Sequence, residues 1–264
     1  MPTGAVILRK SGYRRMRVFL TTVAGMASRF CADLEVPRLK CIYYESTPER
    51  TILYRLLDQA SAYDRFYVVG GFQFEALRDY IGSVMPAEWR DKITMVDNPL
   101  YETTGSGWSL YLGLRAIEES CPDTSEVLFA EGDLCLDTGT LHAIGNAKGD
   151  VLTVNREEIR ADKSVVLYYN AEDIPHYLYD TTHGTLRVEE AFHSIHNSGQ
   201  VWKFADPTRL FSTMHRMPEE RHKKTNLELI DAYYADSQGR NAERVCFQTW
   251  INCNTLADYR RIPF

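Results

Sequence analysis

The first half of the chain alternates short apolar, β-branched runs with amphipathic stretches, and this alternation limits the fold more than any other feature of the sequence. Such a succession is typical of a parallel or mostly parallel sheet with helices packed on its faces. We therefore predict an α/β fold. The predicted strands are 17–23, 65–71, 93–99 and 126–137, and the predicted helices are 51–63, 73–84 and 107–120.

The second half is richer in short β-like segments separated by turn residues, which predicts antiparallel strands that extend or cover the sheet. We expect residues 1–16 to form an N-terminal extension, 17–264 a single domain, and about 151–204 a β-rich lid region. The expected strands here are 150–156, 164–170, 176–182, 185–191, 201–204 and 244–255, and the expected helices are 207–217 and 223–237.

Charge and composition exclude several classes of protein. The formal net charge of −6 argues against nucleic acid as a partner, although a small basic cluster spans Arg9 to Arg17. No apolar run approaches the roughly 18 residues needed to cross a bilayer, and "AVILRK" is interrupted by charge too early for a signal peptide. The six cysteines show no CxxC pair. We expect a cytoplasmic protein with reduced thiols and no membrane partner.

A loop of small residues follows the first predicted strand and ends in an arginine. Gly25 permits backbone angles that other residues avoid, and Ala24, Ala27 and Ser28 keep the approach to the backbone open. Successive N–H groups of such a loop, together with the Arg29 guanidinium, suit a phosphate. The alternative is an ordinary strand–turn–helix connection with a surface arginine. The dinucleotide fingerprint GxGxxG is absent.

The fourth predicted strand runs into an acidic turn, Glu131-Gly132-Asp133. Because ligands bind at the carboxyl ends of parallel strands, and Mg²⁺ needs one or two carboxylates beside substrate phosphates, Asp133 is a candidate metal ligand. Asp137 is a weaker one, and the alternative for Asp133 is a helix cap. Lys40 could reach a phosphate as a point charge, or be an ordinary surface lysine.

These segments occur in the same order as in one known family. They are "AGMASRF", Lys40, "YVVGGFQFEALRDYI", "DNPLYETTGSGWSLYLGL", "FAEGD" and "WINCNTLADY". From about Met16 to its end the chain resembles the nucleotidyltransferases with a GT-A-like fold (NTP-transferase, MobA-like), and is most similar to the cytidylyltransferases of phosphocholine and related phospho- or phosphono-compounds. The resemblance implies a Rossmann-like three-layer α/β/α mixed sheet with a β-rich insertion on the acceptor side.

The resemblance also implies roles for individual positions and Mg²⁺ as cofactor. Cations would hold the triphosphate, loop residues and the start of the third helix would contact the nucleotide, and oxygen ligands would hold the metal. The implied catalytic residues are Arg29, Lys40 and Lys163; the nucleotide-binding residues are Ala24, Gly25, Met26, Ala27, Ser28, Gly70, Gly105, Ser106 and Ser109; the metal ligands are Asp133, Asn254 and Asp231.

Aromatic side chains in segments that should face the cleft can hold an ammonium group by cation–π attraction, and a nearby acid can pair with it. The alternative for these aromatic residues is ordinary core packing. The predicted acceptor contacts are Trp108, Trp202, Glu228 and Trp250.

The sequence departs from the family pattern at three places. Ala27 stands where glycine is usual, which is tolerable if its φ is negative, and Lys40 is separated by two residues from Pro37 instead of following it. Asn254 stands where many relatives carry aspartate, so it brings an amide oxygen but no charge. The candidate sources of that charge are Glu228 and Asp231, on the helix before the last strand.

Transfer of a nucleotidyl group needs no general base, because the attacking phosphate oxygen is already ionised. None of the seven histidines is needed for it. We expect a Mg²⁺-dependent enzyme that transfers CMP from CTP to a small phosphorylated or phosphonylated head group, for surface polysaccharide or lipid decoration. The alternatives are a sugar-1-phosphate nucleotidyltransferase that uses another NTP, and a non-catalytic nucleotide-binding protein. The resemblance leaves room for a homodimer.

Overall fold

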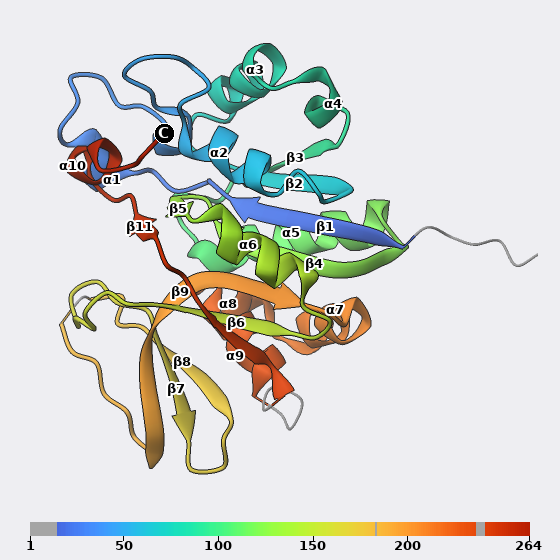
Figure 1. Cartoon of the computed structure of the whole chain (residues 1–264), viewed down its shortest axis with the longest axis vertical. Coiled ribbons are helices and arrows are strands. Elements are labelled where there is room, and N and C mark those ends of the chain that lie inside the picture. The colour runs from blue at the N-terminus through green and yellow to red at the C-terminus, as the bar shows by residue number, and fades with distance from the viewer. Residues whose placement is uncertain (1–14, 183, 236–240) are drawn as a thin grey trace, which may run out of the picture.

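The computed structural model describes residues 15–182, 184–235 and 241–264, and within them nine strands form one mixed sheet (Figure 1). Its order is β10-β6-β9-β4-β1-β2-β3, and β7 and β8 continue from β9. Residues 1–14 of the expected N-terminal extension lie outside the described residues, and Met16 already belongs to the first strand. The strands are β1 (Met16–Thr22), β2 (Arg65–Gly70), β3 (Ile93–Asp97), β4 (Thr124–Glu131), β6 (Val151–Asn155), β7 (Val166–Asn170), β8 (Pro175–Leu178), β9 (Phe192–Phe204) and β10 (Glu243–Cys246).

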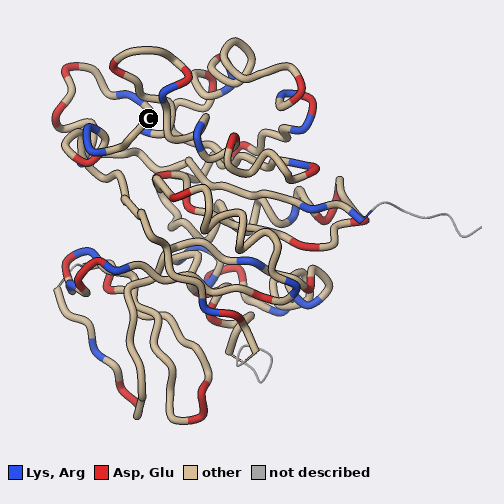
Figure 2. The backbone as a smooth tube through the Cα atoms, viewed as in Figure 1, with Lys and Arg blue, Asp and Glu red and all other residues tan. Residues whose placement is uncertain are grey.

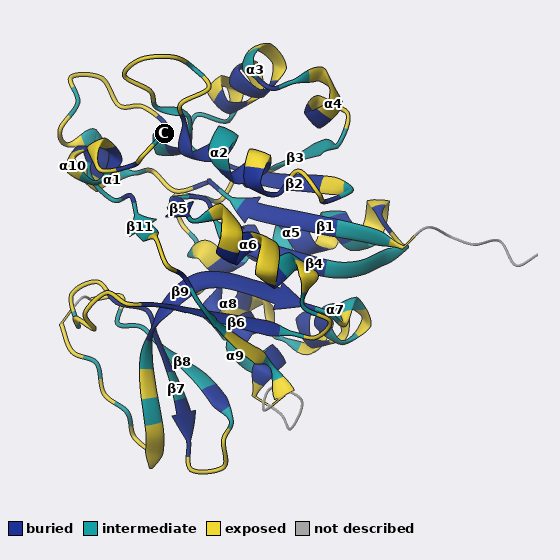
Figure 3. Ribbon diagram, viewed as in Figure 1, coloured by how far each residue is buried: buried dark blue, intermediate teal, exposed yellow. Residues whose placement is uncertain are grey.

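The first half of the sheet is parallel, as predicted: β2 and β4 flank β1, and β3 lies beyond β2. The side chains of these strands alternate between two apolar cores, so that Phe19 faces one core while Val18 and Leu20 face the other. The central strands are therefore buried on both sides (Figure 3). Long apolar strands of this kind form because helices shield both faces of the sheet.

Helices cover both faces, which gives three layers and confirms the predicted α/β/α class. One core joins the sheet to α1, α2, α3, α4, α6 and α10, and the other joins it to α5, α7 and α9. The helices are α1 (Ser28–Cys31), α2 (Ile52–Gln59), α3 (Phe74–Val84), α4 (Ala87–Arg90), α5 (Ser106–Ser120), α6 (Thr138–Asn146), α7 (Pro207–Arg216), α8 (Glu219–His222), α9 (Leu227–Tyr234) and α10 (Leu256–Arg260), with a 3₁₀ turn η1 at Lys40–Ile42.

The second half departs more from the prediction. The long strand β9 pairs antiparallel with β4, β6 and β7, whereas only 201–204 was expected to be a strand. The expected strand at 185–191 is wrong, because β7 already has β8 on one side and β9 on the other, which leaves no place in the ladder for that segment. In Figure 1, β7, β8 and the first part of β9 extend away from the helical layers.

Two expected strands are each divided. The run 126–137 forms β4 and β5 (Leu134–Leu136) with a turn at Gly132, where a Cβ atom would lie 2.3 Å from the Val23 side chain. The run 244–255 forms β10 and β11 (Trp250–Asn252), and β11 pairs antiparallel with β5 in a separate two-stranded sheet. This small sheet brings the end of the chain beside the turn that carries Asp133.

Two caps explain helices that periodicity did not predict. The Asp137 carboxylate accepts a hydrogen bond from the Thr140 N–H and so begins α6, which makes it a helix cap instead of a metal ligand. A capping box between Thr255 and Asp258 begins α10. Within the described residues the predicted helix at 223–237 is shorter, because α9 covers Leu227–Tyr234; its last two predicted positions, 236 and 237, lie outside those residues.

All six cysteines are free, and four of them are buried. Charged residues of both signs are interspersed along the chain (Figure 2). None of the helices in the described ranges has both the length and the apolar character that crossing a membrane requires.

Candidate functional site

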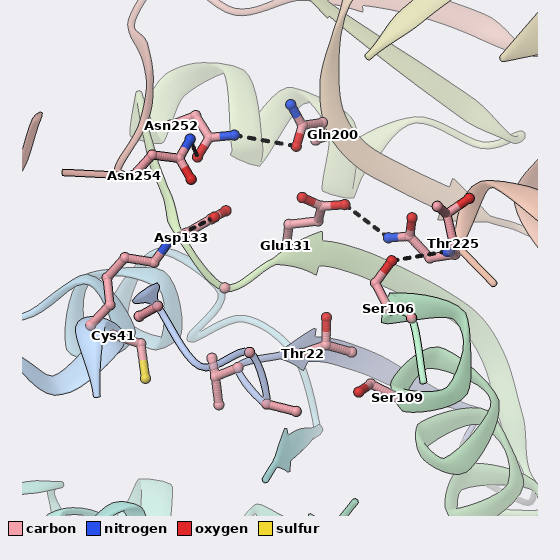
Figure 4. A pocket seen from close by; sticks show the side chains of 18 of the residues that line it. Thr22, Cys41, Ser106, Ser109, Glu131, Asp133, Gln200, Thr225, Asn252 and Asn254 are labelled. Carbon is pink, nitrogen blue, oxygen red and sulfur yellow. Dashed lines mark hydrogen bonds and ion pairs between the residues drawn. The ribbon is translucent and has the colours of Figure 1, made fainter. Parts of the chain in front are cut away.

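The carboxyl ends of β1 and β4 open onto a cavity of about 330 Å³ (Figure 4). Thr22 and Glu131, the last residues of these neighbouring parallel strands, pair directly with each other. The loop after β1 and the turn after β4 therefore reach the same place, which is where α/β sheets bind ligands. The start of α5, the segment before α9, and residues of β9 and β11 complete the wall.

Asp133 and Lys40 form an ion pair on this wall. The Lys40 Nζ donates to Asp133 Oδ2 at 2.9 Å, and both side chains are largely shielded from solvent. The other carboxylate oxygen, Asp133 Oδ1, is buried and has no hydrogen-bond partner among the described residues. A buried oxygen without a donor is costly unless a cation or a ligand satisfies it. This atom fits a bound metal ion.

The main chain of Asp133 is held as firmly as its side chain. The Cys253 N–H donates to the Asp133 carbonyl at 2.8 Å, which ties the segment after β11 to the acidic turn. Gly132 is needed here because the turn packs directly against β1, where a Cβ would also lie 2.6 Å from the Thr22 carbonyl oxygen. The predicted convergence of acidic turn and strand end is thus built by close backbone packing.

A second carboxylate, Glu131, lines the same cavity. Its Oε1 accepts a hydrogen bond from Asn226 Nδ2 at 2.8 Å. Burial, and then the charge of Asp133, raise the pKa of Glu131 to about 7, while Asn226 and Lys40 oppose the shift. Glu131 was not among the predicted ligands, although its place at the end of β4 was the signal that could have found it.

The described residues contain no group of three or more histidine, cysteine, aspartate or glutamate side chains that could hold a metal ion alone. A cation at Asp133 would therefore take its other ligands from water and from a phosphorylated substrate, as Mg²⁺ commonly does. Asp231, a predicted ligand, does not line the cavity: its Oδ1 accepts from the Tyr177 N–H at 2.9 Å and lies 3.4 Å from His176 Nδ1.

The loop after β1 contributes Ala24, Gly25, Ala27 and Arg29 to the wall. Its backbone differs from the expectation. Ala27 has φ 51° and ψ 37°, in the left-handed region, so the condition under which alanine would replace glycine here without strain, a negative φ, is not met. Gly25 has no positive φ, and a Cβ there would meet no atom within 4 Å, so its expected special conformation is not used. The residue that needs glycine-like freedom is Ala27.

Two further residues predicted in this region do not line the cavity. Met26 is 46% exposed, and Ser28 is the first residue of α1. Gly70, at the end of β2, packs against α3, where a Cβ would lie 2.6 Å from the Phe74 ring and 2.7 Å from Leu77. Gly70 therefore serves packing between β2 and α3.

The start of α5 places Gly105, Ser106 and Ser109, three of the residues predicted to bind the nucleotide, on the wall. The Gly105 N–H donates to the Lys223 carbonyl at 2.7 Å, and the Gly107 N–H donates to the Lys224 carbonyl at 3.0 Å. A Cβ on Gly105 would lie 2.1 Å from the Lys224 oxygen. These two glycines allow α5 to meet the segment before α9, and both of their N–H groups are already used by carbonyl oxygens of that segment.

Three of the predicted acceptor residues lie elsewhere, and the fourth lines a second cavity. Trp202 is fully buried, stacks on Phe129 and donates its Nε1–H to the Tyr177 hydroxyl at 2.7 Å, so it belongs to the core. Trp108 packs against Tyr111. Neither tryptophan is on the wall.

Glu228 pairs with Arg221 at 2.7 Å and is not on the wall of the first cavity either. Trp250 donates its Nε1–H to the Gly199 carbonyl and lines the adjacent cavity of about 240 Å³. Four residues line both cavities: Arg29, Lys163, Asn252 and Asn254.

Several polar residues of the wall were missed. Asn98 follows β3 at the same sheet edge, and its Nδ2 donates to Ser109 Oγ at 2.9 Å, so its position at a strand end was a usable signal. Gln200 sits within β9 at φ 55°, which no local pattern indicated. Tyr101, Tyr179 and Asn226 come from loops or helix starts.

Solved structures share this fold along most of their length. The inositol-1-phosphate CTP transferase from T. maritima is 12% identical, with 94% of this chain and 96% of that chain covered and a TM-score of 0.63. A putative glucose-1-phosphate thymidylyltransferase from Bacillus anthracis, in complex with a sucrose, is 11% identical, with 93% of each chain covered and a TM-score of 0.67. HddC from Yersinia pseudotuberculosis, complexed with GMP-PN, is 13% identical, with 94% and 97% covered and a TM-score of 0.59.

Sequence comparison gives a family. No curated protein matches the sequence. A family model described as a domain of unknown function, DUF6564, matches residues 36–263. The structural likeness, at such low identity, establishes a common fold, and the family match spans most of the chain. The chain therefore belongs to the DUF6564 family, and its fold is that of the nucleotidyltransferases.

Proposed function

We propose that this chain is a Mg²⁺-dependent nucleotidyltransferase that transfers CMP from CTP to a small phosphorylated or phosphonylated head group and releases pyrophosphate. The observation that carries the proposal is the meeting of Arg29, Lys40 and Asp133 on one cavity wall, where Asp133 Oδ1 is buried without a partner. Two cations beside an open carboxylate oxygen are suited to a triphosphate and a divalent metal ion.

In this reaction the protein forms no covalent bond with the substrate and acts mainly by positioning and charge neutralisation. An ionised acceptor oxygen attacks the α-phosphorus, a new P–O bond forms, and the bond to the β-phosphate breaks in line so that pyrophosphate leaves. Lys40 and Arg29 would neutralise phosphate oxygens, and the loop N–H groups after β1 would orient the triphosphate. Asp133 would hold Mg²⁺, which when bound neutralises charge that develops on the phosphates. Lys163, on the opposite wall, would reach the α-phosphate.

The names of the structural neighbours support the class of reaction and keep a second candidate in view. One is called a CTP transferase and another a putative thymidylyltransferase. The first name includes inositol-1-phosphate and the second glucose-1-phosphate, both hydroxyl-rich ring compounds with one phosphate. The amide groups of Gln200, Asn226 and Asn252 on the wall suit hydroxyl-rich acceptors. A sugar-1-phosphate nucleotidyltransferase that uses another NTP is therefore the second candidate.

The remaining parts of the proposal concern the whole protein. We propose that the described residues act as a single domain, with about 151–204 on the acceptor side, in a cytoplasmic enzyme whose product feeds surface polysaccharide or lipid decoration. A homodimer is compatible with this proposal.

Pyrophosphate release tests the proposal directly. Purified protein is incubated with Mg²⁺, each of the common NTPs, and a panel of amino-alcohol phosphates, phosphonates and sugar-1-phosphates. Release only with CTP and an amino-alcohol phosphate or phosphonate supports the first candidate, and release with sugar-1-phosphates supports the second. Nucleotide binding without pyrophosphate from any acceptor would overturn both and leave a non-catalytic binding protein.

A further inference from the structure

Asn254 stands beside the acidic turn, but its side-chain oxygen is already used. Asn254 Oδ1 accepts a hydrogen bond from Arg29 Nη2 at 3.1 Å. Because a guanidinium group only donates, the amide must turn its oxygen toward Arg29 and its NH₂ group away from it. This orientation directs the one side-chain atom of Asn254 that could ligate a metal ion to the arginine instead.

The NH₂ group of Asn254 begins a chain of amides that runs across the wall. Asn254 Nδ2 donates to Asn252 Oδ1 at 2.9 Å, and Asn252 Nδ2 donates to Gln200 Oε1 at 3.5 Å. In each of the three amides the oxygen therefore accepts from the side on which Arg29 lies, and in Asn254 and Asn252 the NH₂ group donates away from Arg29. Figure 4 shows Asn252 and Asn254 side by side, with Gln200 beyond them.

The far end of this chain of amides is Gln200, and an irregularity in β9 positions it. Leu152 of β6 pairs with Trp202 and Val154 pairs with Ser198, so β9 places extra residues between two consecutive pairs. Gln200 lies in this bulge in the left-handed region, at φ 55°, and is 3% exposed. Its N–H is held by Ser198 Oγ at 3.1 Å. Bulges commonly redirect a side chain, and here the Gln200 side chain reaches the cavity.

We propose that Asn254 is a positioning residue that holds the Arg29 guanidinium in the cavity, and that Asn252 and Gln200 hold Asn254 in turn. The inference rests on the proposed function, in which Arg29 contacts the triphosphate. A free arginine side chain loses rotamer entropy when it orders on a ligand, and a side chain already held in place loses less. The amide chain thus tightens nucleotide binding without itself touching a metal ion.

Titration calorimetry with CTP and Mg²⁺ tests the inference, because it needs no turnover. We expect Asn254→Ala to raise the Kd of Mg·CTP about fivefold to tenfold, the size of one ordinary hydrogen bond. Arg29→Ala should raise it at least as much, and the double variant should bind no more weakly than Arg29→Ala alone. The Mg²⁺ concentration for half-maximal binding should stay unchanged in Asn254→Ala.

A variant one step further along the chain of amides serves if Asn254→Ala folds poorly. Asn252→Ala removes the acceptor for the Asn254 NH₂ group and should weaken binding of Mg·CTP about threefold. Gln248→Ala is the matched control, because its exposed side chain lies on the same segment and makes no hydrogen bond among the described residues.

Three results would overturn the inference alone. The first is additive losses in the double variant, and the second is a raised Mg²⁺ requirement in Asn254→Ala, which would make Asn254 a metal ligand. The third is equal Kd values for wild type, Asn254→Ala and Asn252→Ala. A wild-type protein that binds no nucleoside triphosphate would instead overturn the proposed function, and the inference with it.

Discussion

The two walls of the cavity differ in chemistry. The wall formed after β1 and β4 carries ionised or ionisable groups, Arg29, Lys40, Glu131 and Asp133, held close to the backbone of adjacent parallel strands. The wall contributed by the second half of the chain carries, apart from Lys163, mainly neutral amides and hydroxyls: Gln200, Thr225, Asn226, Asn252 and Asn254. Under the proposed function this division has a simple meaning. The charged wall would neutralise the phosphates, and the neutral wall would hold the rest of the ligand by hydrogen bonds.

If this division is correct, substitutions on the charged wall will lower turnover the most. We expect Asp133→Asn to lower turnover about 1000-fold, because the carboxylate that would hold the metal ion loses its charge. A pyrophosphate-release assay measures it. Asp137→Asn is the matched control, since Asp137 caps α6 and also accepts from the Gln248 and Thr249 N–H groups. That variant should lose about 1 kcal/mol of stability and keep turnover within about twofold. Full activity in Asp133→Asn would remove Asp133 from the metal site.

The contact between the two halves of the chain, where β9 lies beside β4, should affect the stability of the fold and leave turnover unchanged. Lys203 of β9 is fully buried, lies 2.9 Å from Glu126 of β4, and donates to the carbonyls at the end of α6. We expect Lys203→Met to cost about 3 kcal/mol, because it leaves buried acceptors without a donor. Thermal unfolding should shift by about 6–10 °C.

The same variant should keep its turnover at low temperature, since Lys203 does not line the cavity and its Nζ contacts Glu126, toward the far end of β4. Lys148→Met, an exposed lysine close in sequence to α6, should leave the melting temperature unchanged within about 1 °C. A Lys203→Met protein as stable as the wild type would show that the ion pair does not hold the two halves together.

Loss of the Lys40 charge should have the next largest effect, which is weaker binding of the nucleotide. We expect Lys40→Met to raise the KM for CTP about 30-fold, because a hydrogen-bonded charge facing the triphosphate is lost. Lys40→Arg, which keeps the charge, should recover most of the loss. An unchanged KM in Lys40→Met would mean that Lys40 serves only as the counter-ion of Asp133.

The smallest effect concerns backbone strain at the charged wall. Ala27 holds φ 51°, a conformation that an alanine adopts at a cost of about 1 kcal/mol or more. We expect Ala27→Gly to raise stability by about 0.5 kcal/mol, measured by thermal unfolding, after the greater entropy of glycine in the unfolded chain is subtracted.

The control is Ala32→Gly, five residues further along the chain, where the backbone has φ −60° in the right-handed helical region. That change should lower stability, because glycine there gains no strain relief. A loss of stability in Ala27→Gly equal to that in Ala32→Gly would show that the loop after β1 stores no strain.

The same two halves differ in how far the sequence could predict them. The parallel strands and the helices between them are local patterns, so the sheet edge that gathers Ala24, Arg29 and Asp133 follows from periodicity and from the rule that parallel strands end together. The β-rich half depends on which strands pair over long distances. Neither the bulge at Gln200 nor the pairing of β5 with β11 leaves a local trace in the sequence.

Individual misses have the same physical origin. Trp202 looked like a cleft residue, but β4 and β6 on either side of β9 leave its ring facing the core, where it stacks on Phe129. Asp231 was expected near the metal because it lies on the helix before the last strand, but α9 packs beside β8, where Asp231 binds the Tyr177 N–H. Such placements depend on tertiary packing that composition and spacing do not encode.

The most direct test of the central claim is a crystal structure of the protein with Mg²⁺ and a non-hydrolysable CTP analogue. Our account predicts that the triphosphate lies between the loop after β1 and Asp133, with Lys40 moved from Asp133 Oδ2 toward a phosphate oxygen and a metal ion at Asp133 Oδ1. A triphosphate bound elsewhere on the molecule, with Lys40 and Asp133 still paired, would contradict it.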